Sequence, residues 1–329
     1  MEKTFTTSRW IAALCIVAAL AWALPARAQT VHLSYSGNSG QNIPFWVTYD
    51  SGMFKKYGLN ADLVLISGGL TNIQAVMANE IRFSYLGAAS PIQAAVQGAD
   101  IVILATVYGL MPYGLITGSG IRTATDLKGK RAAVSRIGGI EEVAIRAAIE
   151  KLGLGPKDVT FIQAGPDALR IAAVESGSVS AAAVAPPALF TASARGLNVM
   201  ADLGALGIKY PTSVIAARRA TVTQDRPMAK RFLMGLVEGI HLYKQRKDYA
   251  MQVTAKYTKQ NDAQILSQTY DYFAKNVPLM PFTDPSVIEA GLAATEKPGA
   301  KSAKDLYDNS LLQELEREGF PQKIAKEAR

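Results

Sequence analysis

A turn built on Gly138 and Gly139 is the part of the chain whose residues most clearly suggest chemistry. The turn joins a predicted strand to a predicted helix, and Ser135 and Arg136 stand just before it. Glycine lets the backbone approach another molecule, and the N–H groups at the start of a helix favour an anionic or polar group. A nucleotide P-loop is excluded, because no Gly-Lys-Ser/Thr follows. The turn therefore either holds a small polar or anionic ligand, or only makes a tight connection beside a solvated Arg136.

Residue types that support catalysis or metal binding are scarce in this sequence. The chain has two histidines, His32 and His241, and a single cysteine, Cys15. The histidines are far apart, and no HExxH, GxSxG, GxGxxG or paired-cysteine pattern is present. We therefore expect no catalytic residue, no metal site and no cofactor, and hence a protein that is not an enzyme.

Residues 1–28 have the features of a secretory signal peptide. A basic start is followed by an apolar run over 10–24 and by a small-x-small sequence, which predicts cleavage after Ala28. The run is shorter than the roughly 20 apolar residues that a membrane-spanning helix needs. Cleavage would remove Cys15, so the exported chain would depend on its hydrophobic core and not on disulfides. We expect a periplasmic protein.

The charge of the chain argues against a nucleic-acid partner. The formal net charge is +8, and the leader contributes +2 of it, through Lys3, Arg9 and Arg27 against Glu2, which leaves about +6. These charges are spread along the chain, without the basic run of a nucleic-acid-binding arm.

The sequence contains an internal repeat. A shift of 98 residues places 72–103 over 170–201 without a gap, so that apolar positions meet apolar positions and Gly98 meets Gly196. Few identities survive, but both copies show the same order of helix, short strand, Pro-led helix, glycine and strand. A repeat of this length is typical of a duplicated α/β lobe and too long for a solenoid.

Strand patterns alternate with helical patterns in both copies. Strands are predicted over 31–35, 61–66, 81–86 and 101–107 in the first copy and over 131–134, 159–163, 181–184 and 199–202 in the second. Helices are predicted near 44–56, 70–79, 91–97, 140–152, 167–176 and 187–195. The alternation predicts an α/β fold with mainly parallel sheets and helices on both faces, in which a ligand lies beyond the carboxyl ends of the strands.

The chain is expected to cross twice between two lobes. Two Gly/Pro-marked segments, each with a short apolar strand, follow Val107 and Asp202. We predict a discontinuous first lobe that the mostly helical C-terminal part of the chain covers, and a continuous second lobe. The first lobe takes residues 29–112 and 213–329, and the second takes 113–212.

Three separated stretches resemble the nitrate/taurine/alkanesulfonate-binding group of periplasmic solute-binding proteins, which includes binders of a thiamine pyrimidine precursor. The stretch over 42–87 is similar to the start of that family's first lobe, 125–139 to its entry into the second lobe, and 308–320 to its C-terminal segment. The resemblance implies a two-lobed type II periplasmic binding fold with a hinge of two crossing segments. Such a protein, as a monomer, closes on a small solute and delivers it to an ABC permease and its ATPase. The family leaves the solute open among sulfonates, carboxylates and pyrimidine-like molecules.

The resemblance also implies which residues line the cleft between the lobes. They come from five places, and two of these places correspond to each other under the 98-residue shift. The implied ligand-binding residues are Asn38 and Asn42; Gly68, Gly69 and Thr71; Ala89 and Ser90; Ser135, Arg136, Gly138, Gly139 and Glu141; and Pro186 and Pro187.

Glu141 departs from the family pattern, whose members commonly continue the Ser-Arg turn with small hydroxyl residues. Two interpretations are open. The carboxylate either complements the positive end of the helix dipole, or it faces the cleft and repels a sulfonate or a nitrate. In the second case the solute is amine-bearing, zwitterionic or more apolar.

Two other functions are compatible with the same fold. One is a ligand-sensing receptor subunit that feeds no transporter. The other is an enzyme of thiamine-precursor synthesis, which in this family uses histidine and cysteine. The exported chain would have no cysteine, so we expect binding rather than catalysis.

Overall fold

The structure is a computed structural model that describes residues 30–295 and 301–327. The predicted signal peptide lies outside these residues. Within the described ranges, no helix combines the length and apolar character that crossing a membrane requires.

The first sheet has five strands in the order β2-β1-β3-β10-β4. Strands β1, β2 and β3 are parallel, and β10 runs antiparallel to both of its neighbours, so the sheet is mixed. The strand bounds are β1 Val31–Tyr35, β2 Ala61–Leu65, β3 Phe83–Leu86, β4 Ile101–Leu110 and β10 Lys209–Arg218.

The second sheet repeats this arrangement, in the order β7-β6-β8-β5-β9. Strands β6, β7 and β8 are parallel, and β5 lies antiparallel between β8 and β9. The bounds are β5 Gly114–Thr117, β6 Lys130–Val134, β7 Val159–Gln163, β8 Ala181–Val184 and β9 Asn198–Asp202. The antiparallel strand of each sheet follows a predicted crossing segment. Strand β5 is short, as predicted, whereas β10 has ten residues and is longer than predicted.

The repeat predicted from the sequence has an exact structural counterpart in three pairs of elements. Strand β2 at 61–65 corresponds to β7 at 159–163, and β3 at 83–86 corresponds to β8 at 181–184. Helix α4 (Gly69–Met77) corresponds to α7 (Asp167–Glu175), again 98 residues apart. The two sheets are therefore copies of one α/β pattern.

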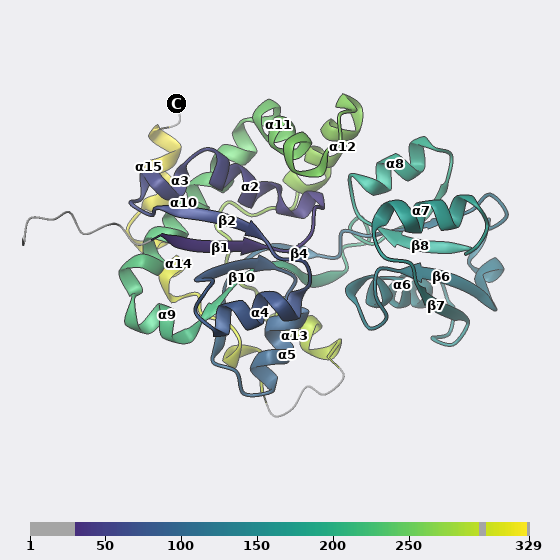
Figure 1. Ribbon diagram of the computed structural model, residues 1–329, viewed down its shortest axis with the longest axis horizontal. Coiled ribbons are helices and arrows are strands. Elements are labelled where there is room, and N and C mark those ends of the chain that lie inside the picture. The colour runs from purple at the N-terminus through teal and green to yellow at the C-terminus, as the bar shows by residue number, and fades with distance from the viewer. Residues whose placement is uncertain (1–29, 296–300, 328–329) are drawn as a thin grey trace, which may run out of the picture. The chain divides into compact units, whose positions relative to one another are not determined.

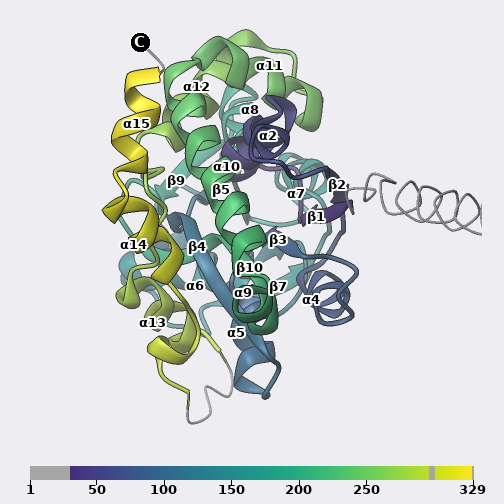
Figure 2. The ribbon, with the colours of Figure 1, turned by 90° about the vertical axis from the view of Figure 1, so that its left-hand side faces the viewer.

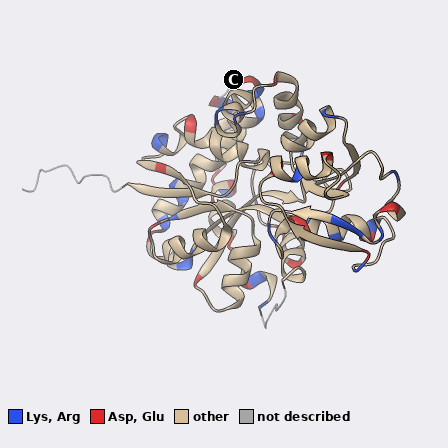
Figure 3. Ribbon diagram, turned by 45° about the vertical axis from the view of Figure 1, so that its right-hand side comes forward, with Lys and Arg blue, Asp and Glu red and all other residues tan. Residues whose placement is uncertain are grey.

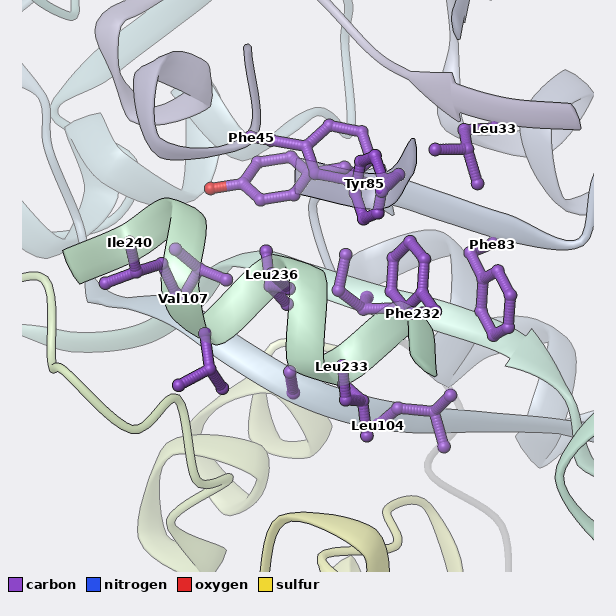
Figure 4. Packing of buried hydrophobic residues seen from close by; sticks show 14 of the residues in the cluster. Leu33, Phe45, Phe83, Tyr85, Leu104, Val107, Phe232, Leu233, Leu236 and Ile240 are labelled. Atoms are coloured by element: carbon purple, nitrogen blue, oxygen red, sulfur yellow. The ribbon is translucent and has the colours of Figure 1, made fainter. Parts of the chain in front are cut away.

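One face of the first sheet is covered by α10 and the helices around it. Aromatic and aliphatic side chains of α10 (Arg226–Gln245) pack between the sheet and α2 (Ile43–Asp50), as Figure 4 shows. Burial of this apolar surface is the main stabilising contribution of the layer. The residues labelled in that view are Leu33, Phe45, Phe83, Tyr85, Leu104, Val107, Phe232, Leu233, Leu236 and Ile240.

The predicted helix near 44–56 is interrupted, which corrects the sequence-based prediction. It consists of α2 and the short α3 (Met53–Lys56), separated at Gly52, whose φ of 75° lies in the left-handed region. The other helices around α10 are α9 Arg219–Gln224, α11 Lys247–Thr258, α12 Ala263–Ala274, α14 Ser310–Arg317 and α15 Phe320–Glu327; the last two contact α10 directly (Figure 2).

The remaining sheet faces carry their own apolar layers. The second face of the first sheet packs against α4, α5 (Ala89–Val96) and α13 (Pro285–Ala293). In the second sheet, α6 (Ile140–Lys151) covers one face, while α7 and α8 (Ala188–Ala194) cover the other. Helices thus lie on both faces of both sheets, as Figure 1 shows.

Candidate ligand-binding cleft

A cleft of about 540 Å³ lies where loops and helix starts of both lobes meet. The first-lobe wall consists of the loop after β1, the start of α4 and two residues beside β3 and β10. The second-lobe wall consists of the starts of α6 and α7 with the ends of their strands. The first-lobe wall is lined by Ser36, Gly37, Asn38, Ser39, Gln41, Gly68, Gly69, Gly87 and Thr212; the second by Tyr113, Ser135, Arg136, Gly139, Ile140, Glu141, Pro166, Asp167, Arg170 and Ala185.

The loop after β1 is held in place by a buried amide. The Asn42 Nδ2 donates hydrogen bonds to the carbonyl oxygens of Ser36 (3.3 Å) and Gly37 (2.8 Å). Asn42 is fully buried and does not line the cleft. It therefore shapes this wall from behind.

The start of α4 is held by a second buried amide, that of Asn72. Its Nδ2 donates to the carbonyl oxygens of Ile66 (2.6 Å) and Gly68 (3.0 Å). Its Oδ1 accepts from the hydroxyls of Ser34 and Ser84, at 2.8 and 3.0 Å. Because no side chain caps this helix, the first N–H groups of α4 are available to a ligand.

The second-lobe wall is organised around the buried guanidinium of Arg170, whose side chain is 3% exposed. Its Nε donates to the carbonyl oxygen of Ala183 (3.2 Å), and its Nη1 donates to that of Gly165. Its Nη2 forms an ion pair with Asp167 and lies 3.8 Å from the Glu141 Oε1. All three nitrogens of Arg170 are therefore engaged by the protein.

The two carboxylates beside Arg170 face the cleft. Glu141 accepts a hydrogen bond from the Ser135 hydroxyl at 2.7 Å through its Oε2. The Asp167 side chain is 38% exposed and lines both the cleft and the smaller adjoining pocket. Desolvation of its carboxyl by the surrounding protein raises the pKa of Asp167, although the neighbouring Arg170 acts to lower it. Glu141 lines the cleft, as one of the two interpretations of this residue expects.

Tyr113 lies beside these carboxylates and is only 6% exposed. Burial raises its pKa, and the negative charges of Glu141 and Asp167 raise it further, so the hydroxyl stays protonated at neutral pH. In the described part of the chain, this hydroxyl has no hydrogen-bond partner.

The glycine turn is partly closed on itself. Gly138 has a φ of 74°, and its N–H donates to the Glu142 Oε2 at 2.9 Å. The N–H of Gly139 donates to the carbonyl oxygen of Arg136 at 3.0 Å. These two amides are therefore not free for a ligand, and the Arg136 side chain is exposed at the cleft rim.

The structure brings half of the predicted site residues to the cleft wall: Asn38, Gly68, Gly69, Ser135, Arg136, Gly139 and Glu141. The others lie behind or beside it: Asn42, Thr71, Ala89, Ser90, Gly138, Pro186 and Pro187.

Two of the displaced residues have clear structural roles. A Cβ on Gly69 would come within 2.1 Å of the Ser90 hydroxyl, so Ser90 and α5 support the turn that Gly69 makes. The carbonyl oxygen of Pro186 accepts from the N–H of Gly40 at 2.9 Å and so links the two lobes. Pro187 lines a smaller adjoining pocket of about 340 Å³.

Sequence reasoning missed Tyr113, Asp167 and Arg170. The only signal for Arg170 was its register in the repeat, because the 98-residue shift places it on Asn72. Asp167 is the first residue of the helix predicted over 167–176, but neither its side chain nor that of Tyr113 was predicted to bind a ligand.

Comparison with known proteins identifies the family. A family model described as NMT1/THI5 like matches residues 39–250, which is more than half of the chain. The chain belongs to the NMT1/THI5-like family. A relative of this NMT1/THI5-like protein, from Brucella abortus and named only as a binding protein, is 26% identical over 223 residues, 67% of this chain and 68% of its own length.

Solved structures share the two-lobed fold. The ligand-binding component of an ABC-type import system from Staphylococcus aureus has a TM-score of 0.72 at 13% identity, over 87% of this chain and 98% of that one. The alkanesulfonate-binding protein SsuA from Xanthomonas axonopodis, bound to MOPS, has 0.68 at 19%, over 85% and 98%. The periplasmic nitrate-binding protein NrtA from Synechocystis has 0.69 at 15%, over 91% of both chains. The resemblance inferred from the sequence is confirmed. Because the sequence identities to these structures are low, the structures support the fold of this chain but not its ligand.

One structural neighbour of this NMT1/THI5-like protein is named as an enzyme. The desulfurization enzyme DSZB has a TM-score of 0.67 at 17% identity, over 88% of this chain and 99% of that one. In the present chain, neither His32 nor His241 lines the cleft. His32 contacts Asp62 at the surface, and His241 is buried in α10. No cluster of three or more metal-ligating side chains occurs among residues 30–295 and 301–327.

Proposed function

We propose that this protein is the extracytoplasmic solute-binding component of an ABC importer. In this proposal, a small polar organic solute enters the cleft, the two lobes close on it, and the closed form delivers it to the permease and its ATPase. The proposal includes the periplasmic location, the cleavage after Ala28 and the division into two lobes predicted from the sequence, with the second crossing placed before β10, which begins at Lys209.

The observation that carries the proposal is a single cleft lined by polar groups from both lobes. Contacts to both walls exist only when the lobes are close, so a bound solute favours the closed arrangement. Two segments connect the sheets, between β4 and β5 and between β9 and β10, and a change of dihedral angles there would let the lobes move.

The chemistry of the walls favours binding over turnover. The wall residues provide hydrogen-bond donors, acceptors and charges, which are the groups that recognise a solute. No histidine or cysteine lines the cleft to act as a nucleophile or as a neutral base. Basic and acidic residues alternate along the ribbon in the view of Figure 3, and a small solute fits this better than a nucleic acid.

The test has two parts. The purified protein is incubated with an extract of small polar metabolites, washed, and its retained solutes are identified by mass spectrometry. Small-angle scattering then compares the ligand-free protein with the protein saturated with the retained solute. We expect one solute at a 1:1 ratio and a smaller radius of gyration with it. Retention of no solute, or identical scattering profiles, would contradict the proposal, and chemical conversion of the solute would indicate an enzyme.

A further inference from the structure

Three polar groups on the second-lobe wall have hydrogen-bonding capacity that the protein leaves unused and that a bound solute could satisfy. The Glu141 Oε2 accepts from Ser135, but its Oε1 has only the distant Arg170 nitrogen at 3.8 Å. One oxygen of Asp167 pairs with Arg170, and the other accepts no hydrogen bond from the described residues. The hydroxyl of Tyr113, a residue that is 6% exposed, also forms no hydrogen bond with the described residues.

The charge balance of this group is negative. Glu141 and Asp167 bring two carboxylates, whereas Arg170 brings one guanidinium. Arg136, the other cation of the wall, is exposed and forms no ion pair with either carboxylate within the described ranges. One further positive charge would therefore neutralise the group.

Arg170 does not offer an anion site, although it lies on the wall. Three of its five N–H groups donate to Ala183, Gly165 and Asp167, and its side chain is 3% exposed. A solute anion would have to reach this buried group past two carboxylates. A positively charged group that donates hydrogen bonds would be attracted instead, because carboxylate oxygens without donors already face the cleft.

We propose that Glu141, Asp167 and Tyr113 form a subsite for a protonated amino group of the solute. Arg170 is the positioning residue that holds the two carboxylates in place. The inference rests on the proposed function and narrows it: the solute is a small amine-bearing molecule.

The opposite wall is suited to the other end of such a solute. The first-lobe wall has no Asp, Glu, Lys or Arg among its lining residues. It offers the uncapped start of α4 and the loop after β1, both of which present main-chain N–H groups. A solute with an amine at one end and a carbonyl, carboxylate or phosphonate at the other would satisfy both walls.

The test uses pairs of probes that differ in the amino group. The pairs are β-alanine with propionate, 4-aminobutyrate with butyrate, 2-aminoethylphosphonate with ethylphosphonate, and benzylamine with benzyl alcohol. Thermal shift identifies the probes that stabilise the full chain, because a ligand of the native state raises the melting temperature. Calorimetry then gives each Kd. We expect amines to bind, and their nitrogen-free partners to bind at least tenfold more weakly.

Variants assign the effect to the subsite. We expect Glu141→Gln to weaken amine binding by tenfold or more, and Tyr113→Phe by three- to tenfold, because each removes one partner of a charged donor. Glu150→Gln is the matched control, since Glu150 lies on the same helix but is exposed and outside the cleft. Melting temperatures of the ligand-free variants confirm that they fold.

Three results would overturn the subsite. They are equal binding of an amine and its nitrogen-free partner, an unchanged Kd in Glu141→Gln, and a lack of stabilisation by every amine in the panel. Failure of the proposed function is distinguishable, because the extract experiment would then retain no solute of any class. Retention of a solute without an amino group would leave the proposed function standing and remove the subsite.

Discussion

Asn72 and Arg170 occupy the same place in the two lobes, since each is the fourth residue of a helix that starts at the cleft. Both are buried, and both donate to carbonyl oxygens of the turn before their helix. Asn72 is neutral and completes its bonds with two serine hydroxyls. Arg170 is charged and holds two carboxylates.

This difference separates the chemistry of the two walls. At this position, both copies of the duplicated fold have a buried polar side chain that hydrogen-bonds the helix to the preceding turn; we call Asn72 the neutral tie and Arg170 the charged tie. The partners of Asn72 make a wall of main-chain and hydroxyl groups, while those of Arg170 make a wall of ionised side chains. In the 98-residue register, Asp167 corresponds to Gly69. The ionised wall thus arises from a few substitutions on a shared scaffold.

The largest expected loss of stability comes from removing the charged tie, Arg170. We predict that Arg170→Met lowers the free energy of unfolding by about 3–5 kcal/mol, because two carboxylates lose a buried counter-charge and two carbonyl oxygens lose their donor. Denaturant unfolding of the ligand-free protein measures the change. Arg122→Met is the matched control in the same lobe, since Arg122 is exposed, and a similar loss in both variants would contradict the assigned role.

Removing the neutral tie, Asn72, is expected to lower the free energy of unfolding by a smaller amount. We predict that Asn72→Leu lowers the free energy of unfolding by about 2–3 kcal/mol, because two carbonyl oxygens lose a donor but no buried charge is left alone. The Ser34 and Ser84 hydroxyls retain their mutual hydrogen bond of 2.9 Å. Gln74→Leu, at an exposed position of the same helix, is the control. A loss equal to that of Arg170→Met would show that charge is not what distinguishes the two ties.

The sequence predicted the strands and helices that form the two walls better than it predicted the side chains that line them. Strands β1, β7 and β8 lie at the predicted residues, because short apolar runs bounded by turn residues have few alternative structures. The correspondence of β2 with β7 and of α4 with α7 follows from the register of the repeat. The interruption at Gly52 was missed, because a helical apolar pattern continues across that glycine.

The cleft chemistry was only partly predictable, for a physical reason. Glu141 and Arg170 lie 29 positions apart, on helices that cover opposite faces of the second sheet. Their approach depends on how far each helix start extends past the sheet edge, which periodicity does not determine. The pair Asp167 and Arg170, three residues apart, is also what an exposed helix face would show. Burial alone tells the two cases apart.

The pH dependence of stability tests the ionised wall. Because the pKa of Asp167 is raised in the folded protein, its carboxyl binds a proton more tightly there than in the unfolded chain. Its contribution therefore favours folding at low pH and is lost as pH rises above 3.8, the ordinary pKa of an aspartate. We predict that the unfolding free energy of the wild type minus that of Asp167→Asn falls as pH rises from about 4, by at most about 1.4 kcal/mol per pH unit.

The charges that face Asp167 are those of Arg170 and Glu141, and together with burial they set the direction of the difference curve. Chemical unfolding at a series of pH values gives the difference curve. A curve that rises with pH would mean that attraction to Arg170 outweighs burial, and the wall would then be better described as a satisfied ion pair.

The smallest effect is expected at the other arginine of the same wall. Arg136 is exposed at the cleft rim and has no ion pair within residues 30–295 and 301–327, so we predict that Arg136→Ala changes the free energy of unfolding by less than about 0.5 kcal/mol. Its effect on binding is the informative measurement. If Arg136 reaches an anionic end of the solute, the variant weakens that solute by about 1.5–3 kcal/mol, which calorimetry would detect, and an unchanged Kd would remove Arg136 from the site. The two arginines of this wall would then have separate roles. The buried Arg170 binds groups of the protein, whereas the exposed Arg136 is free to bind the solute.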